Sequence, residues 1–259
     1  MTAPRIGMCA LALVNLALAL GLFLHAPWAT AMWPWTEQPL DYTLLAGFLA
    51  AGFGAVLWIA LTAEWGALVG ALLDVGLFNL GAAAWLWSLW FAERDSAVLV
   101  RAIAFTVGAG AELAMLRVAL RHPVRDTRPA DRLLVVSFWV FALVLLASGA
   151  ALLAHLPVWP WPLAPRSSTL IGLLFLGSAV YFLHGLYKPT WHGMKGQLVA
   201  FLLYDLVLVQ PYANLGSSNV YDLNYASLAV YLAVIAYSGC LAAYYLFMNP
   251  RTKGWAVQA

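Results

Sequence analysis

The sequence predicts an all-α polytopic membrane protein with eight transmembrane helices, arranged as two parallel four-helix repeats with both termini inside. Three observations support this fold class: the composition, a duplicated tryptophan-rich segment and the distribution of basic residues. Of the 259 residues, 64% are hydrophobic and 9% are charged, whereas soluble domains carry about 25% charged residues. The mean hydropathy is +0.85. The net charge of +2 is too small to indicate binding to nucleic acid.

The duplication is clearest at Trp33-Pro34-Trp35, which returns at Trp159-Pro160-Trp161, 126 positions later. The same shift, without a gap, superimposes several further residues. These further pairs are Pro39/Pro165, Thr43/Thr169, Leu44/Leu170, Trp65/Trp191 and Gly70/Gly196. It also places Asn79 on Asp205. Such self-similarity at a constant offset indicates a repeated structural unit.

The N-terminal segment resembles a signal peptide, because an apolar stretch precedes Ala29-Thr30-Ala31. However, residues 12–27 match residues 142–157 when they are shifted by 130 positions, and the second segment lies in the middle of the chain. We therefore predict that the first segment is a retained helix. The change of offset from 130 to 126 predicts a four-residue insertion in the first copy, within Trp28 to Met32.

Eight stretches are about long enough to cross a bilayer, which takes about 20 apolar residues. They are Gly7–Leu24, Tyr42–Ala63, Ala67–Phe91, Val98–Leu120, Leu133–His155, Thr169–Tyr187, Met194–Asn214 and Tyr225–Met248. We expect residues 1–120 to form the first repeat, 121–132 a basic cytoplasmic linker and 133–259 the second repeat. An even number of helices per repeat preserves orientation, so the copies are predicted to be parallel.

The basic residues predict the orientation. If the N-terminus is inside, ten of the thirteen Lys and Arg residues lie on the inner side, and only Arg94, Arg101 and Arg166 lie outside. This distribution places both termini in the cytoplasm, and we expect the protein in the bacterial cytoplasmic membrane. The linker also contains Asp126 and Asp131, so we expect it to be solvated and able to bind anionic lipid.

Both Trp-Pro-Trp segments are then expected on the outer face. Proline interrupts a helix, and tryptophan favours the headgroup region. We therefore interpret Trp33, Trp35, Trp159 and Trp161 as interfacial anchors that contact lipid. Alternatively, they form the rim of a cavity that is open to lipid and bind a substrate there.

The last outer loop, Gln210 to Tyr225, is more polar than its counterpart in the first copy. Its residues Tyr212, Tyr221, Asp222 and Asn224 could bind a headgroup, a sugar or a partner domain. Alternatively, this is an ordinary solvated loop.

Three carboxylates within the predicted helices are candidate catalytic or proton-carrying residues: Asp74, Glu112 and Asp205. Asp74 and Glu112 lie on consecutive helices and could share a proton. Asn79 is a candidate substrate-binding residue, because it occupies the position equivalent to Asp205. The alternative is that each acid is paired structurally.

Two repeat-related histidines, His25 and His155, could coordinate one metal ion or haem if their helices faced each other. Each also precedes an x-Pro break at a helix C-terminus, where the helix dipole favours histidine. We favour this capping role and predict no metal or cofactor.

The segment Trp-Pro-Trp-x-Leu-x-Pro, followed by Arg166 and Gly172, resembles a segment of bacterial membrane proteins. The resemblance covers one helix and its approach, and it implies no activity. Three functions therefore stay open. The protein is a non-catalytic component of a membrane assembly that contacts lipids and other subunits, an intramembrane enzyme acting on a lipid or isoprenoid, or a small proton-coupled transporter.

Overall fold

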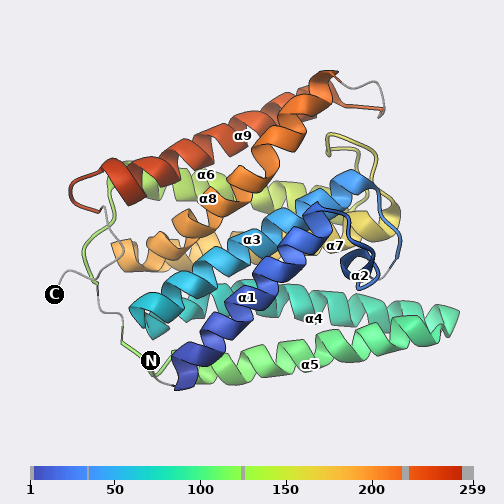
Figure 1. Ribbon diagram of the computed structural model, residues 1–259, viewed down its shortest axis with the longest axis horizontal. Coiled ribbons are helices and arrows are strands. Elements are labelled where there is room, and N and C mark those ends of the chain that lie inside the picture. The colour runs from blue at the N-terminus through green and yellow to red at the C-terminus, as the bar shows by residue number, and fades with distance from the viewer. Residues whose placement is uncertain (1–2, 34, 124–125, 218–221, 253–259) are drawn as a thin grey trace. The chain divides into compact units, whose positions relative to one another are not determined.

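The computed structural model describes residues 3–33, 35–123, 126–217 and 222–252 (Figure 1). Every secondary-structure element in this part of the chain is a helix. Eight of these helices are long and apolar enough to cross a membrane. The prediction of eight apolar helices in an all-helical chain is therefore confirmed.

The eight long helices follow the predicted ranges closely. They are α1 (Ala3–Phe23), α3 (Pro39–Thr62), α4 (Leu68–Glu93), α5 (Ser96–Ala119), α6 (Arg132–Leu153), α7 (Pro165–Tyr187), α8 (Trp191–Ala213) and α9 (Tyr225–Ala243). The shorter elements are α2 (Pro27–Thr30), two 3-10 turns (Trp65–Ala67 and Asn214–Ser217) and a π-helical turn (Tyr244–Met248) that continues α9.

Helices α3 and α7 begin three or four residues before the predicted positions, at Pro39 and Pro165. Proline suits the first turn of a helix, because the amide hydrogen that it lacks would have no partner there. Thr43 and Thr169 donate hydrogen bonds to the carbonyl oxygens of these prolines, at 3.0 and 3.1 Å. The prolines therefore start the two helices rather than only interrupting the preceding ones.

A short helix, α2, overlaps the insertion that is predicted within Trp28 to Met32. The four residues Pro27–Thr30 make up the single-turn helix α2. Proline again occupies its first turn. The second copy was predicted to lack these extra residues, and there the chain continues from the end of α6 into the second Trp-Pro-Trp segment without such a helix.

The chain forms two compact units that do not follow the order of the sequence. Unit 1 takes residues from 1–64, 158–163 and 194–259, and unit 2 takes residues from 65–157 and 164–193. Unit 1 therefore contains α1, α3, α8 and α9, and unit 2 contains α4, α5, α6 and α7. The predicted boundaries at 120 and 133 separate segments along the sequence, whereas these units are groups of residues that contact one another. The units therefore do not test the predicted repeat, which stays a prediction.

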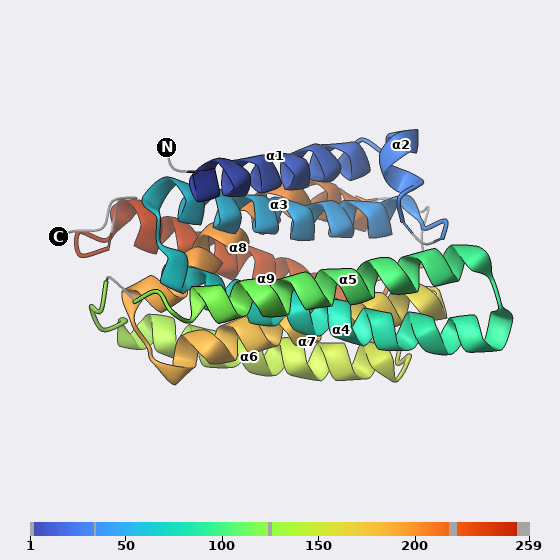
Figure 2. The same cartoon turned by 90° about the horizontal axis from the view of Figure 1, so that it is seen from below.

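Within each unit the four helices follow one order of contacts. In unit 1, α1 packs along α3, α3 contacts α8 where Gly54 meets Leu203, and α8 contacts α9 through Asp205 and Ser238 (Figure 1). In unit 2, α6 packs along α7, α7 along α4, and α4 along α5 (Figure 2). A Cβ atom at Gly54 would lie 2.5 Å from Leu203 Cδ1, so glycine allows the close approach of α3 and α8.

Candidate functional site

The carboxyl group of Asp205 lies between α8 and α9 in unit 1. Its side chain is only 5% exposed. Oδ2 lies 2.8 Å from the Ser238 hydroxyl oxygen, while Oδ1 is buried without a hydrogen-bond partner among the described residues. A Cβ atom at Gly239 would lie 3.3 Å from Oδ2, so the glycine leaves room for the carboxyl group. The sequence identified Asp205 as a candidate but not Ser238.

Two tyrosines on the same helices lie next to this carboxyl group. The hydroxyl groups of Tyr204 on α8 and Tyr231 on α9 are hydrogen-bonded to each other, and both tyrosines interact electrostatically with Asp205. The Tyr204 ring packs edge-on against Phe48 of α3, with centroids 5.2 Å apart. The aromatic rings thereby connect α3 to the contact between α8 and α9.

The second Trp-Pro-Trp segment is buried in unit 1. Trp161 is 2% exposed, and its Nε1–H donates a 2.7 Å hydrogen bond to Oδ1 of the buried Asp41 in the first turn of α3. Its ring packs on Tyr212, and the ring of Trp159, which is also buried, packs on Tyr231. Trp159 and Trp161 therefore differ from the expected interfacial anchors: the Asp41 carboxyl group and the tyrosine rings enclose this segment.

The first Trp-Pro-Trp segment is stabilised within itself instead, although Pro34 lies outside the described residues. Trp33 and Trp35 both donate hydrogen bonds to Oε1 of Glu37, each at 2.8 Å. Both tryptophans are half-buried. The position equivalent to Glu37 in the second copy holds Leu163, so Trp161 takes its acceptor from α3.

In unit 2 the corresponding polar contact joins α4 to α5. The Asn79 side-chain amide donates a 2.6 Å hydrogen bond to Oε1 of Glu112, whereas Oε2 is buried with no partner among the described residues. Asp74 lies close enough to Glu112 for the two carboxyl groups to interact electrostatically, as their helices led us to expect. A Cβ atom at Gly177 of α7 would lie 2.6 Å from Asp74 Oδ1, so Asp74 packs tightly against α7.

Asn79 and Asp205 belong to different units, and each has its partner on the following helix of its own unit. Both contacts span 33 residues of sequence. Because Glu112 and Ser238 lie 126 positions apart, like Asn79 and Asp205, the predicted offset extends into the last helix of each copy. Extending the sequence comparison into these helices would have identified Ser238.

The two histidines that could have held a metal ion occupy helix ends. His25 and His155 have left-handed backbones, with φ of 52° and 54°. Beside them, the amides of Ala26 and Leu156 donate hydrogen bonds back to Gly21 and Ala151, a common way to end a helix. His25 Nε2 lies 3.1 Å from the Pro39 carbonyl oxygen.

These positions agree with the capping interpretation. In the described part of the chain, the His, Cys, Asp and Glu side chains form no group of three or more that could hold a metal ion.

The polar loop before α9 is partly helical. α8 continues through Pro211, and Tyr212, expected in a solvated loop, is fully buried and donates to the Leu40 carbonyl oxygen. Tyr221 lies outside the described residues, and Asp222 is exposed. The backbone amide of Asn224 donates a 2.8 Å hydrogen bond to the Pro160 carbonyl oxygen, so the end of the loop is joined to the second Trp-Pro-Trp segment.

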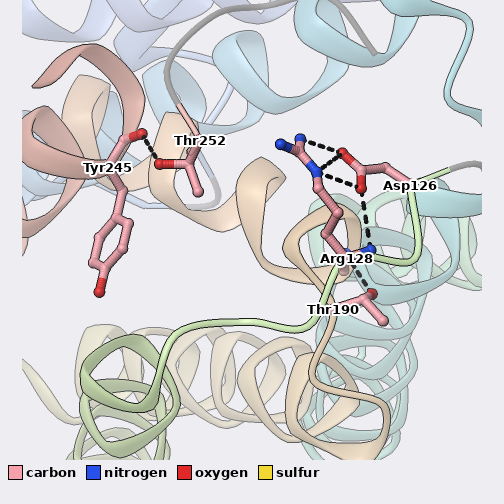
Figure 3. A network of polar contacts seen from close by, with 6 residues as sticks. Asp126, Arg128, Thr190, Tyr245 and Thr252 are labelled. Atoms are coloured by element: carbon pink, nitrogen blue, oxygen red, sulfur yellow. Dashed lines mark hydrogen bonds and ion pairs between the residues drawn. The ribbon is translucent and has the colours of Figure 1, made fainter. Parts of the chain in front are cut away.

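The segment between α5 and α6 contains a charged pair formed by two of its own residues (Figure 3). Arg128 binds both oxygens of the buried Asp126, with Nε 2.9 Å from Oδ1 and Nη2 2.6 Å from Oδ2. Hydrogen bonding from Arg128 holds the pKa of Asp126 below its ordinary value and raises that of Arg128. The Trp191 amide donates to the Arg128 carbonyl oxygen. This part of the predicted solvated linker is therefore anchored.

Comparison of the chain with protein-family models, with curated proteins and with solved structures found no match. The fold and the site therefore define a class: a helical protein whose eight apolar helices are suited to an integral membrane position, with polar contacts between neighbouring helices of each unit.

Proposed function

We propose that the protein is an integral protein of the bacterial cytoplasmic membrane and acts as a non-catalytic component of a membrane assembly. The observation that carries this proposal is the hydrogen bond from Trp161 to Asp41. The most conspicuous motif of the sequence and the carboxyl group nearest to it are buried against each other, where they hold helices together. They are therefore enclosed by the unit's own side chains rather than available to a substrate.

Contact with lipid or with another subunit is better supported at the first copy. Helix α2 and the residues after it expose two large apolar side chains, Trp28 (54%) and Met32 (64%). Tryptophan favours the headgroup region of a membrane. We therefore assign the membrane-surface contact to the inserted segment and to the neighbouring half-buried Trp33 and Trp35.

The proposal includes two parallel four-helix copies with both termini in the cytoplasm. Two polar contacts that span 33 residues each, and that start 126 positions apart, support the duplication. The orientation rests on the concentration of Lys and Arg in the segments assigned to the inner side.

A second candidate, a small proton-coupled transporter, is favoured by a specific observation. Glu112 Oε2 and Asp205 Oδ1 are buried without a hydrogen-bond partner among the described residues. Buried carboxyl groups within membrane helices are expensive, and they mark proton or ion pathways in transporters.

Photo-crosslinking from single positions tests the proposed role. A photoreactive residue in place of the exposed Trp28 is expected to form adducts with a neighbouring chain or with lipid in native membranes. The same residue in place of the buried Trp161 serves as the matched control and is expected to react only within the chain.

Two results would contradict the proposal. One is equal labelling of outside molecules from both positions. The other is a proton flux across the membrane of liposomes that contain only this protein, provided that Asp205→Asn abolishes the flux. This second result would favour the transporter.

A further inference from the structure

Ser238 has more acceptor neighbours than its single hydroxyl proton can serve. Its Oγ lies 2.8 Å from Asp205 Oδ2, 2.8 Å from the Val234 carbonyl oxygen and 3.1 Å from the Ile235 carbonyl oxygen. A hydroxyl group donates one proton and can accept through its lone pairs. If Asp205 were ionised, all three neighbours would be acceptors competing for one proton.

Other hydroxyl groups on the helices of this protein indicate the usual acceptor for such a proton. Six of those described lie within hydrogen-bond distance of the carbonyl oxygen four residues earlier: Thr30, Thr43, Thr62, Thr106, Ser137 and Thr169. Serine and threonine commonly form this bond within helices. For Ser238 the corresponding acceptor is Val234. The 2.8 Å contact with Asp205 then needs a proton from the carboxyl group.

We infer that Asp205 is a neutral carboxylic acid that donates to Ser238, and that the two residues form a proton-binding site within the helices of unit 1. The proton lies on Asp205 Oδ2, the Ser238 hydroxyl oxygen accepts it in a hydrogen bond, and the Ser238 proton goes to the Val234 carbonyl oxygen. Every proton then has one acceptor.

The surroundings of Asp205 agree with a neutral group. Its side chain is 5% exposed, and Oδ1 has no hydrogen-bond partner among the described residues. Among the described residues, the titratable groups that interact with it are Tyr204 on α8 and Tyr231 on α9, whose hydroxyl groups are bonded to each other. These neighbours are hydroxyl groups rather than cations, and a buried carboxylate without a cation is strongly disfavoured.

This site goes beyond the proposed role as a membrane component and does not depend on it. A protein that only packs with other subunits can contain a neutral acid, and so can a transporter. The inference concerns the protonation of one carboxyl group, which can be measured without knowing a partner or a substrate.

Infrared spectroscopy of the full chain in liposomes at neutral pH tests the inference. We expect a carbonyl stretching band of a protonated carboxyl group that is missing from Asp205→Asn. In Ser238→Ala the band should persist but shift, because the acid loses its acceptor. Thr62→Val is the matched control, since Thr62 also contacts the carbonyl oxygen four residues earlier, and it should leave the band unchanged.

Two outcomes would overturn the inference. One is an identical band in the wild type and in Asp205→Asn. The other is a wild-type spectrum without any band from a protonated carboxyl group. This second outcome can be measured on the wild-type protein alone. If Asp205→Asn does not fold, Ser238→Ala decides: an unshifted band would show that Ser238 does not accept from the protonated acid.

Discussion

Each of the two units contains a polar contact between neighbouring helices, but the carboxyl group lies on the earlier helix in unit 1 and on the later helix in unit 2. In unit 1 the acid Asp205 lies on α8 and the hydroxyl group of Ser238 on α9, 2.8 Å apart. In unit 2 the amide of Asn79 lies on α4 and the acid Glu112 on α5, 2.6 Å apart. Both units thus have a contact at this position, with the carboxyl group on α8 in unit 1 and on α5 in unit 2. Each helix pair therefore joins one donor with one acceptor, and the two units use different residues for this contact.

The aromatic neighbours differ in the same way. Phe78 and Phe105 of unit 2 pack edge-on with centroids 5.7 Å apart. The residues 126 positions later are Tyr204 and Tyr231, whose hydroxyl groups are bonded. Unit 1 thus carries two additional hydroxyl groups beside its acid. This difference makes the surroundings of Asp205 the more promising place for function.

The largest expected effect concerns the two Trp-Pro-Trp segments. Trp161→Ala should destabilise the protein by about 3–5 kcal/mol, because it leaves a cavity and removes the donor to the buried Asp41. Trp35→Ala should cost less than half as much, since Trp35 is half-buried and Trp33 still donates to Glu37. Denaturant unfolding in detergent micelles measures both, and equal losses would contradict the difference between the segments.

The next effect tests the polar contacts. Asn79→Ala removes the amide that donates to Glu112 and should cost about 1–3 kcal/mol. Asp205→Asn should cost less than about 1 kcal/mol, because an amide can donate to Ser238 as a neutral acid does. The same unfolding measurement compares them. A larger loss for Asp205→Asn would show that the amide cannot replace the acid in this contact.

A smaller effect is expected from copying the tyrosine pair into unit 2. Phe78→Tyr alone should cost about 1 kcal/mol, because it places a hydroxyl group in an apolar contact. The double variant with Phe105→Tyr should recover part of this loss if the two hydroxyl groups bond as in unit 1. A double-mutant cycle measures the coupling. Strict additivity would mean that the unit 2 backbone cannot bring the hydroxyl groups together.

The smallest effect concerns the ion pair between Arg128 and Asp126 in the connection between α5 and α6. Arg128 lowers the pKa of Asp126 in the folded protein. The pair therefore contributes stability above the unfolded pKa of about 3.9, and this contribution is lost as the pH falls through the lower folded value. Asp126→Asn should remove no more than about 1 kcal/mol at neutral pH. Thermal unfolding of both proteins from neutral to acidic pH should show the difference shrinking, and a difference that grows with acid would contradict it.

The positions of the helices could be predicted because they depend on local properties. A stretch of apolar residues long enough to cross a bilayer forms a helix whatever its neighbours are, since the backbone must satisfy its own hydrogen bonds in lipid. The x-Pro breaks after His25 and His155 likewise predicted where two helices end. The candidates Asp74, Glu112 and Asp205 were found because carboxyl groups are rare in such stretches.

The amino-acid sequence by itself thus determined the helices, the two helix ends at His25 and His155, and the ionisable residues within the helices. Only the tertiary structure decided which side chains meet: Asp205 with Ser238, Trp161 with Asp41, and Tyr204 with Tyr231. These partners come from segments far apart in the chain, and their contacts depend on which helix faces pack together. Helices that are apolar on all sides show no polar stripe to identify the packed face, so their packing follows from shape and from a few polar contacts.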